Sequence, residues 1–348
     1  MLRDCDQGAM NAKINVDHPS AWRGQELLVK HGWITQLSDD HLAELKVAVA
    51  AVQGLASCDE ITAACFPLPT LSGVLQGIRD SLENGPGVAL IRGLDPKRAR
   101  TEDGWRRLFM GLASQIGTPV SQSASGEILF SVRDAGFADD DPRARGPNTR
   151  KQLTYHTDRC DVIGFCCVRQ AKSGGESFIV SSMALYLEIQ KLRPDLLAVL
   201  EQPYYYARHN VDHGNQKPWC RQPIFSIHEG HFASNMLRTL IDRAYAMPEL
   251  PDMTGVQKEA LDYVQELAHN PRFHVSFMQR PGDILFLNNW VTLHRRSEFE
   301  DYAEPERKRH LLRVWLSVPN SRPLHPLFKD NYGATGAGEI RGGMRKAQ

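Results

Sequence analysis

The sequence predicts a mainly antiparallel β-protein with a helical flank on its N-terminal side. Three observations support this fold class. Apolar residues follow a helical period up to about residue 117 and a mostly extended pattern from Glu127 onward. The extended part holds many short apolar runs separated by turns, which is typical of antiparallel architecture. Hydrophobic residues make up 42% of the 348 residues, which is ample for a buried core.

The helical flank is predicted to cover residues 1–84. Ser38 is a suitable N-cap, and the two aspartates that follow it favour the positive end of a helix. A second amphipathic pattern covers residues 71–82 and ends at a cluster of Asn, Gly and Pro. A short apolar run at 88–91 predicts a buried strand, and residues 101–117 form a third helical pattern.

The extended part is predicted to hold eight strands. They are expected at 127–133, 161–168, 176–181, 203–209, 223–228, 273–279, 283–287 and 310–318. Helical patterns interrupt the strands at 183–200, where Pro194 fits the first turn of a second helix, and at 254–268. We therefore expect a β-domain at 85–322, followed by a C-terminal tail at 323–348.

Two segments are expected to be exposed. Residues 134–151 combine acidic and basic side chains with two prolines and two glycines, which indicates a long loop. Such a loop is either a lid or simply a solvated connection. The tail is rich in glycine from Asn331 onward and is expected to bury little.

Composition excludes several classes of function. The 41 Lys and Arg residues are balanced by 41 Asp and Glu residues, so no net field favours nucleic acid or an anionic membrane. The seven cysteines lack repeated CxxC spacing, which argues against a disulfide framework and a structural zinc module. We find no secretion signal and no apolar run near the roughly 20 residues of a membrane helix. The sequence thus favours a cytoplasmic protein with a small-molecule partner and leaves a homo-oligomer open.

A candidate metal site comprises His156, Asp158 and His294. An HxD pair is expected about once by chance in such a chain, but this one directly precedes the predicted strand at 161–168. His294 follows another strand-like run at 282–287. Two imidazoles and one carboxylate form the facial triad of non-haem iron(II) oxygenases, which leaves open coordination positions. From spacing alone, ordinary hydrogen-bonded histidines are an equally good interpretation.

Two arginines lie four residues apart in the segment 309–316, which overlaps the last predicted strand. If the whole segment is a strand, both lie on it. Strand alternation places Arg309 and Arg313 on the same face, with Leu311 between them. Arginines facing the interior need anionic partners, and a dicarboxylic acid would supply one in bidentate geometry. The alternative is a surface strand whose arginines pair with Glu304 or Glu306.

Together and in this order, these motifs resemble the taurine dioxygenase-like (TauD/TfdA) family of Fe(II)- and 2-oxoglutarate-dependent oxygenases, which includes clavaminate synthase. The resemblance spans roughly Pro86 to Pro319. Its components are Gly87–Gly93, Gly117-Thr118-Pro119, His156-Thr157-Asp158, Gly174-Gly175-Glu176-Ser177, Gly282-Asp283 leading to His294, and Arg309 with Arg313. The family fold is a double-stranded β-helix, or jelly roll, which agrees with the predicted strands.

The resemblance implies a role for each matching residue. His156, Asp158 and His294 correspond to the iron ligands. Ser177 stands where the family has a hydroxyl, usually from threonine, that bonds the distal carboxylate of 2-oxoglutarate. Arg309 matches the arginine that pairs with the same carboxylate.

The substrate is less determined. Arg313 matches a position that binds the substrate's acidic group in several relatives. The arginine assignments depend on the RxxxR spacing, because the acidic segment between His294 and Arg309 could displace the alignment.

The implied activity is that of a 2-oxoglutarate-dependent dioxygenase with Fe(II), 2-oxoglutarate and O2. It would form succinate and CO2 while oxidising a C–H bond of a small, anionic substrate. The carboxylate of Asp158 favours hydroxylation, whereas desaturation, ring closure and epoxidation use the same triad. The alternative is a jelly-roll protein that binds a metal or a small acid without oxidising it. A metal hydrolase is less favoured because it leaves both arginines unexplained.

Overall fold

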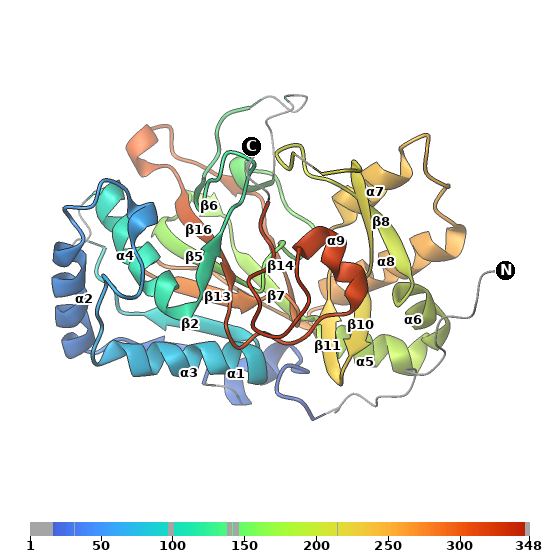
Figure 1. Cartoon of the computed structure of the whole chain (residues 1–348), viewed down its shortest axis with the longest axis horizontal. Helices are drawn as coiled ribbons and strands as arrows, with labels where there is room; N and C mark the ends of the chain where they lie inside the picture. The colour runs from blue at the N-terminus through green and yellow to red at the C-terminus, as the bar shows by residue number, and fades with distance from the viewer. Residues whose placement is uncertain are drawn as a thin grey trace.

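The fold consists of two facing β-sheets, three small strand pairs and a surround of helices (Figure 1). We describe it from a computed structural model, which covers residues 17–344 apart from 31, 97–100, 138–140, 142–145 and 214. None of the helices in this part of the chain combines the length and apolar character needed to cross a lipid bilayer.

The major sheet has seven strands in the order β1-β2-β13-β5-β16-β3, and β4 also pairs with β16. Its strands are β1 (Ile34–Gln36), β2 (Val88–Arg92), β3 (Thr118–Val120), β4 (Leu129–Val132), β5 (Val162–Arg169), β13 (Ile284–Asn288) and β16 (His310–Ser317). Neighbouring strands are antiparallel except for β1 and β2, which are parallel.

The minor sheet has the order β12-β7-β14 and is antiparallel. Its strands are β7 (Ser177–Ser181), β12 (His274–Phe277) and β14 (Thr292–Arg296). The small pairs are β6 (Ser173–Gly174) with β15 (Phe299–Glu300), β8 (Pro203–Ala207) with β9 (Trp219–Pro223), and β10 (Phe225–His228) with β11 (His231–Ser234).

Alternation along β13 explains how the two sheets are layered. Ile284 and Phe286 pack in one apolar cluster with the N-terminal helices. Leu285 and Leu287 belong to a second cluster that includes Ile179 of the minor sheet. Because side chains of a strand alternate between its faces, the major sheet packs helices on one face and the minor sheet on the other.

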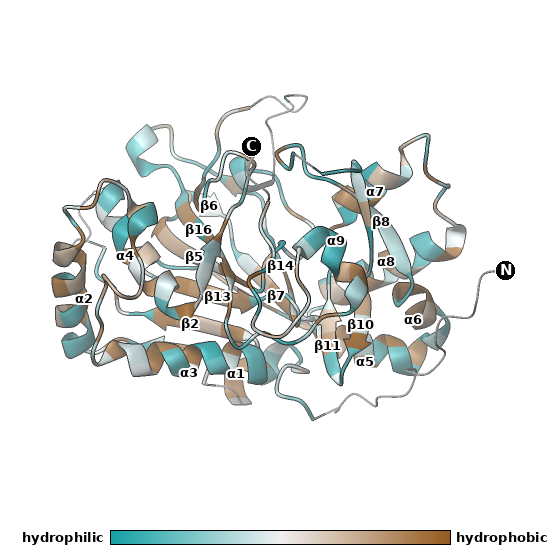
Figure 2. Cartoon of the chain, viewed as in Figure 1, coloured by the Kyte–Doolittle hydropathy of each residue, from teal (hydrophilic) through white to brown (hydrophobic). Residues whose placement is uncertain are grey.

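The N-terminal helices cover the outer face of the major sheet, at the left of Figure 1. They are α2 (Asp39–Ala51), α3 (Leu71–Asn84) and α4 (Glu102–Ile116), and α1 (Gly24–Lys30) precedes them. Ser38 caps α2 as predicted, with its hydroxyl accepting from His41 N. In Figure 2 the central strands are mainly hydrophobic, while the helices carry hydrophilic patches along their length.

A second apolar core lies at the other end of the molecule. It is built by the buried sides of α5 (Ser182–Leu192), α6 (Pro194–Leu200), α7 (Arg238–Tyr245) and α8 (Gly255–His269). Pro194 stands at the start of α6, as expected. The capping box between Thr254 and Gln257 fixes the start of α8.

The expectation that the glycine-rich tail buries little is wrong. Tyr332 at the end of α9 (Lys329–Tyr332) and Arg341 are each only 2% exposed, and Met344 is also buried. The reason is Asp161, a fully buried carboxylate at the start of β5. Arg341 Nε donates to Asp161 Oδ1 at 2.7 Å, so the tail supplies a counter-charge to the core.

Asp161 is fully satisfied within the core. Its Oδ1 atom also accepts from Trp290 Nε1 at 2.9 Å, and its Oδ2 atom accepts from Val318 N at 3.0 Å and Ser317 Oγ at 3.3 Å. Buried charges are tolerated when they are paired and fully hydrogen-bonded, as here. The network therefore joins β5, β16 and the tail.

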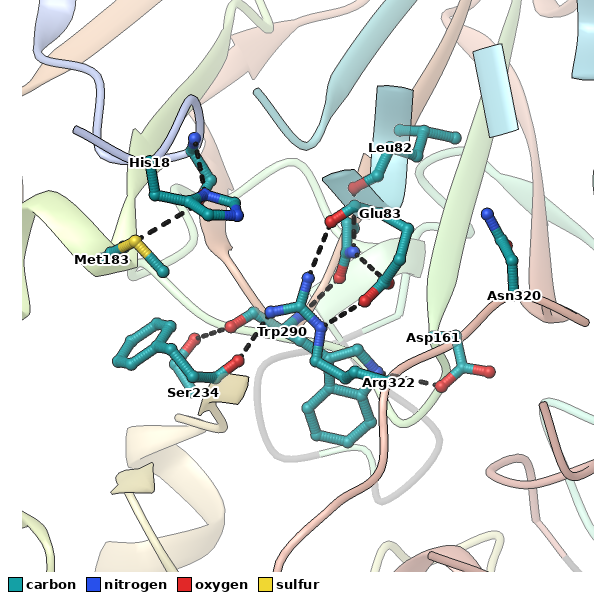
Figure 3. Close-up of polar contacts among 12 residues, drawn as sticks. His18, Leu82, Glu83, Asp161, Met183, Ser234, Trp290, Asn320 and Arg322 are labelled. Atoms are coloured by element: carbon teal, nitrogen blue, oxygen red, sulfur yellow. Dashed lines mark hydrogen bonds and ion pairs between the residues drawn. The ribbon is translucent and has the colours of Figure 1, made fainter. Parts of the chain in front are cut away.

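A second buried ion pair lies beside this network (Figure 3). Arg322 Nε donates to Glu83 Oε1 at 2.7 Å, and Arg322 Nη1 donates to the Phe232 carbonyl at 2.6 Å. Glu83 Oε2 accepts from Asn288 Nδ2 at 3.1 Å. This pair connects the end of α3 with β11, β13 and the start of the tail.

All eight predicted strands occur, with small shifts at their ends. Strands β1, β3, β6, β9, β11, β14 and β15 were not predicted. Of the predicted loop at 134–151, the described residues lie outside strands and form one short turn at Gly146–Asn148. Asp139, Asp140, Arg143 and Arg145 of that loop lie outside the described residues.

Candidate metal centre and its cavity

The structure brings His156, Asp158 and His294 together, although up to 138 positions separate them in the chain. One ligand atom from each lies within 4.8 Å of the others. Asp158 Oδ2 is 3.3 Å from His294 Nε2 and 3.8 Å from His156 Nε2. All three side chains are largely buried, with exposed fractions of 10–14%.

Backbone pairing fixes the separation of the two histidines. His156 N donates to His294 O, and His294 N donates to His156 O, both at 3.0 Å. The two residues thus form an isolated antiparallel bridge, with His294 in the middle of β14. Because the exchange is mutual, the distance between the two imidazoles depends on sheet geometry and not on a loop.

An amide side chain positions the aspartate. Asp158 N donates to Asn289 Oδ1 at 3.0 Å, and Asn289 N donates to the Asp161 carbonyl at 2.9 Å. Asn289 is 1% exposed, and its Nδ2 atom contacts Cys160 Sγ at 3.1 Å. The turn before β14 therefore holds the Asp158 backbone in place.

The protonation states suit a metal. Burial lowers the pKa of His156 to about 4, so its imidazole is neutral at pH 7. His156 Nδ1 lies 2.8 Å from the Thr154 carbonyl, which places the proton on Nδ1 and leaves the Nε2 lone pair for a metal. Burial alone would raise the pKa of Asp158, but the Arg313 guanidinium and both histidines hold it well below its usual range.

The three side chains line a cavity of about 410 Å³ between the two sheets. Ser177, Arg309 and Arg313, the other predicted site residues, line the same cavity. Arg309 is 4% and Arg313 is 6% exposed, so the surface-strand alternative is wrong. Glu304 pairs instead with Arg307 at the surface.

The lining carries a strong excess of positive charge. Its charged residues that the structure describes are one acid, Asp158, and seven arginines: Arg159, Arg208, Arg243, Arg295, Arg296, Arg309 and Arg313. Two of these arginines have acids outside the lining, because Arg159 pairs with Asp212 and Arg208 with Asp330. The remaining excess favours anions inside the cavity.

Arg309 is poised for an anion. Its main-chain N–H donates to Asp301 Oδ1 at 2.7 Å, whereas the buried Nη1 atom has no hydrogen-bond partner among the described residues. Burial lowers the pKa of Arg309 to about 10, so the group stays charged at neutral pH. An unpaired buried guanidinium is costly, which points to a ligand.

Arg313 lies next to the metal ligands. Its Nε atom donates to Gln122 Oε1 at 2.7 Å, and its Nη1 atom is 3.5 Å from Asp158 Oδ1. The guanidinium also stacks over Phe130 and Trp315, at 5.2 and 5.1 Å from the ring centroids. It is thus held close to Asp158 within the cavity lining.

Sequence reasoning missed three residues of this site. Asn289, Gln122 and Gln279 each contact a predicted site residue, but none belongs to a motif that we recognised. Asn289 was visible only as half of a turn-forming Asn-Asn pair before His294. A turn that leads into a metal-ligand strand is the signal that could have identified it.

Comparisons with known proteins agree with this geometry. A profile of the family described as "Taurine catabolism dioxygenase TauD, TfdA family" matches residues 52–315. FR-33289 synthase from Streptomyces rubellomurinus (strain ATCC 31215) is 30% identical over 310 residues, which cover 87% of this chain and 90% of that protein.

Solved structures show the same fold. Asparagine oxygenase (AsnO) matches with a TM-score of 0.64 at 17% identity, over 88% of this chain and 99% of that one. The non-heme iron oxygenase OrfP, solved in complex with Fe and alpha-ketoglutaric acid, matches with a TM-score of 0.61 at 15% identity, over 82% and 94%. The predicted β-fold with helical additions is therefore confirmed. The profile match and the FR-33289 synthase relationship show that this chain belongs to the TauD/TfdA family of dioxygenases.

Proposed function

We propose that this protein is an Fe(II)- and 2-oxoglutarate-dependent oxygenase. In the balanced reaction, 2-oxoglutarate, O2 and a C–H substrate give succinate, CO2 and an oxidised product, most simply the alcohol. The observation that carries the proposal is the convergence of two imidazoles and one carboxylate at a cavity that also holds an unpaired buried guanidinium. Membership of the dioxygenase family supports it.

In this proposal His156, Asp158 and His294 hold the iron. The fit is supported by the buried Asp158 Oδ2 atom, which lacks a hydrogen bond with the described residues and lies near the Nε2 atoms of both histidines. When bound, iron would supply open coordination positions for the 2-oxoacid and O2. Arg313 lowers the pKa of Asp158, so the carboxylate carries no proton that a metal would have to displace.

We assign Ser177 and Arg309 to the distal carboxylate of 2-oxoglutarate. Both line the cavity, and Arg309 offers a charged donor without a partner among the side chains that the structure describes. A guanidinium suits this task because it binds a carboxylate with two parallel hydrogen bonds. The neighbouring glycine at 175 supports the assignment, since a Cβ there would lie 3.1 Å from Arg309 Nε.

We further propose a small anionic substrate, with Arg313 as one of its contacts. After one carboxylate of 2-oxoglutarate is matched to Arg309, the arginines of the lining still outnumber its acids, since Arg313 shares its one acid, Asp158, with the two histidines. An anionic group would offset them. The enclosing sheets exclude bulk water from the reacting atoms, which limits side reactions.

The remaining expectations belong to the same proposal. Catalysis is assigned to residues 85–322, with the segments before and after as additions that complete its packing. All cysteines that the structure describes are free thiols, which supports a reducing, cytoplasmic location. A small molecule, and not nucleic acid or a membrane, is the proposed partner, and a homo-oligomer is compatible with the proposal.

The test uses the purified chain under anaerobic conditions. Addition of Fe(II) and 2-oxoglutarate is expected to give a weak visible charge-transfer band, and admission of O2 is expected to give succinate. If the folded protein binds iron but shows neither signal, the oxygenase proposal is wrong and the non-oxidising binding protein takes its place. Mn(II) in place of Fe(II) is the matched control, because it should support binding without the band.

A further inference from the structure

Three hydrogen-bond donors of the cavity lining are connected by direct contacts or through neighbouring residues. Two of them, Ser177 and Arg309, already belong to the proposed cosubstrate site. The third is the carboxamide of Gln279, which lines the same cavity and is 5% exposed. We propose that Gln279 is a third donor to the distal carboxylate of 2-oxoglutarate, an inference that rests on the proposed function.

The backbone of Gln279 is fixed by the sheet and by two contacts. Phe277, the last residue of β12, pairs with Ser177 in β7, so Gln279 follows only two residues later. The Gln279 carbonyl accepts from Gln170 Nε2 at 2.9 Å and contacts Cys167 Sγ at 3.6 Å. The side chain therefore extends from a backbone that is fixed by these contacts, not from a free loop.

The hydrogen bonding of the side chain is incomplete. Ser177 Oγ donates to Gln279 Oε1 at 3.3 Å, but Gln279 Nε2 is buried and has no partner within the described part of the chain. Arg309 Nη1 is in the same condition. Buried donors are rarely left unpaired, because each unpaired donor loses its hydrogen bond to water without a replacement. Two such donors beside a hydroxyl indicate a missing acceptor.

The segments that carry the three donors share neighbouring residues. Cys167 contacts the Gln279 carbonyl, and the Arg309 guanidinium is close enough to act on the Cys167 thiol electrostatically. Gly175, two residues before Ser177, lies against Arg309. Arg309 and Gln279 thus approach the start of β7 from β16 and β12.

The missing acceptor is best matched by a carboxylate. One guanidinium balances one negative charge, while the neutral amide and the hydroxyl add direction without adding charge. A carboxylate has about four acceptor positions, enough for all three donors. A lone water has two acceptor positions and no charge, so it would leave the guanidinium uncompensated.

The test measures equilibrium binding and not turnover. Dissociation constants of 2-oxoglutarate and of 2-oxopentanoate, which has a methyl group in place of the distal carboxylate, are measured by anaerobic calorimetry with the Fe(II)-loaded chain. Gln279→Leu is expected to weaken 2-oxoglutarate binding about tenfold to a hundredfold, as for hydrogen bonds to charged groups. Binding of 2-oxopentanoate should be unchanged. Gln279→Glu should weaken the binding of 2-oxoglutarate further, because the new glutamate carboxylate would repel the distal carboxylate of the ligand.

Gln202→Leu is the matched control, since this glutamine is exposed and does not line the cavity. It should affect both ligands little. Equal weakening of both ligands by Gln279→Leu, or no change, would overturn the inference and leave the proposed function intact. If the wild-type chain binds no 2-oxoglutarate, the proposed function itself fails.

Discussion

Asp158 is the residue on which the iron site depends most directly. It supplies the only carboxylate of the cluster, and both histidine Nε2 atoms lie within 4 Å of its Oδ2 atom. Asp158→Ala is expected to abolish succinate formation and to reduce bound iron, because two neutral imidazoles hold a divalent cation weakly. Iron content by atomic absorption and succinate by chromatography measure the two effects.

The control for this variant is Asp262→Ala, which changes an exposed aspartate of α8. It should keep wild-type iron content and turnover. Retention of wild-type activity by Asp158→Ala would contradict the ligand assignment.

Asn289 acts on the iron site through the backbone. Its amide oxygen accepts from Asp158 N, so Asn289→Ala frees the turn that aims the carboxylate. Groups that orient metal ligands typically contribute 10–100-fold to metal affinity, and a loss of about that size is expected here. Competition with a chelator measures it. Asn270→Ala, at the exposed end of α8, should leave iron affinity unchanged.

Some site residues belong to sequence motifs, whereas others do not. His156, Asp158 and Arg309 stand in motifs with fixed spacing, so resemblance could indicate them. Asn289 and Gln279 contact the site only because two sheets bring distant segments together. Their positions depend on strand register, which local sequence does not state.

At the level of elements, β14 shows why one strand was missed. Its residues His294, Arg295 and Arg296 line the cavity, whereas Leu293 packs into the second core. Polar side chains therefore occupy interior positions where a search for apolar alternation expects hydrophobic residues. Strand β16 also lines the cavity but was predicted, because most of its residues are apolar. A strand with several polar side chains in the interior is not detected by a search for hydrophobic alternation.

Helix α4 offers a test of packing against helix propensity. Gly111 lies in its middle, and a Cβ there would come within 2.5 Å of three atoms of the Phe66 ring. Propensity predicts that alanine stabilises a helix by about 1 kcal/mol relative to glycine. Because Phe66 is fully buried, we expect Gly111→Ala instead to destabilise the protein by about 1–3 kcal/mol.

Gly77→Ala in α3 is the matched control, because nothing lies within 4 Å of its added Cβ. It should raise stability slightly. Denaturant unfolding of both variants compares them. The expectation for Gly111 is refuted if both substitutions stabilise the protein equally.

For the whole molecule, stability depends on the ion pair between the tail and the core. Arg341→Met leaves the Asp161 carboxylate buried without its counter-charge and is expected to cost about 3–5 kcal/mol. Adding Asp161→Asn to Arg341→Met should recover part of the loss, because a neutral amide oxygen still accepts from Trp290 Nε1. Thermal and denaturant unfolding measure both variants.

Arg307→Met serves as the comparison, since its pairing with Glu304 is exposed. Its effect should stay within about 0.5 kcal/mol. A loss below about 1 kcal/mol for Arg341→Met would show that Asp161 is neutralised in another way.

The Asp161–Arg341 contact also sets an order of events during synthesis. Asp161 directly precedes strand β5, yet the guanidinium that neutralises it is made 180 residues later. A chain that emerges N-terminus first must keep this carboxylate hydrated until its last segment is available. The centre of the major sheet is therefore expected to exclude water only late in folding. Nascent chains that lack residue 341 should remain sensitive to protease near β5.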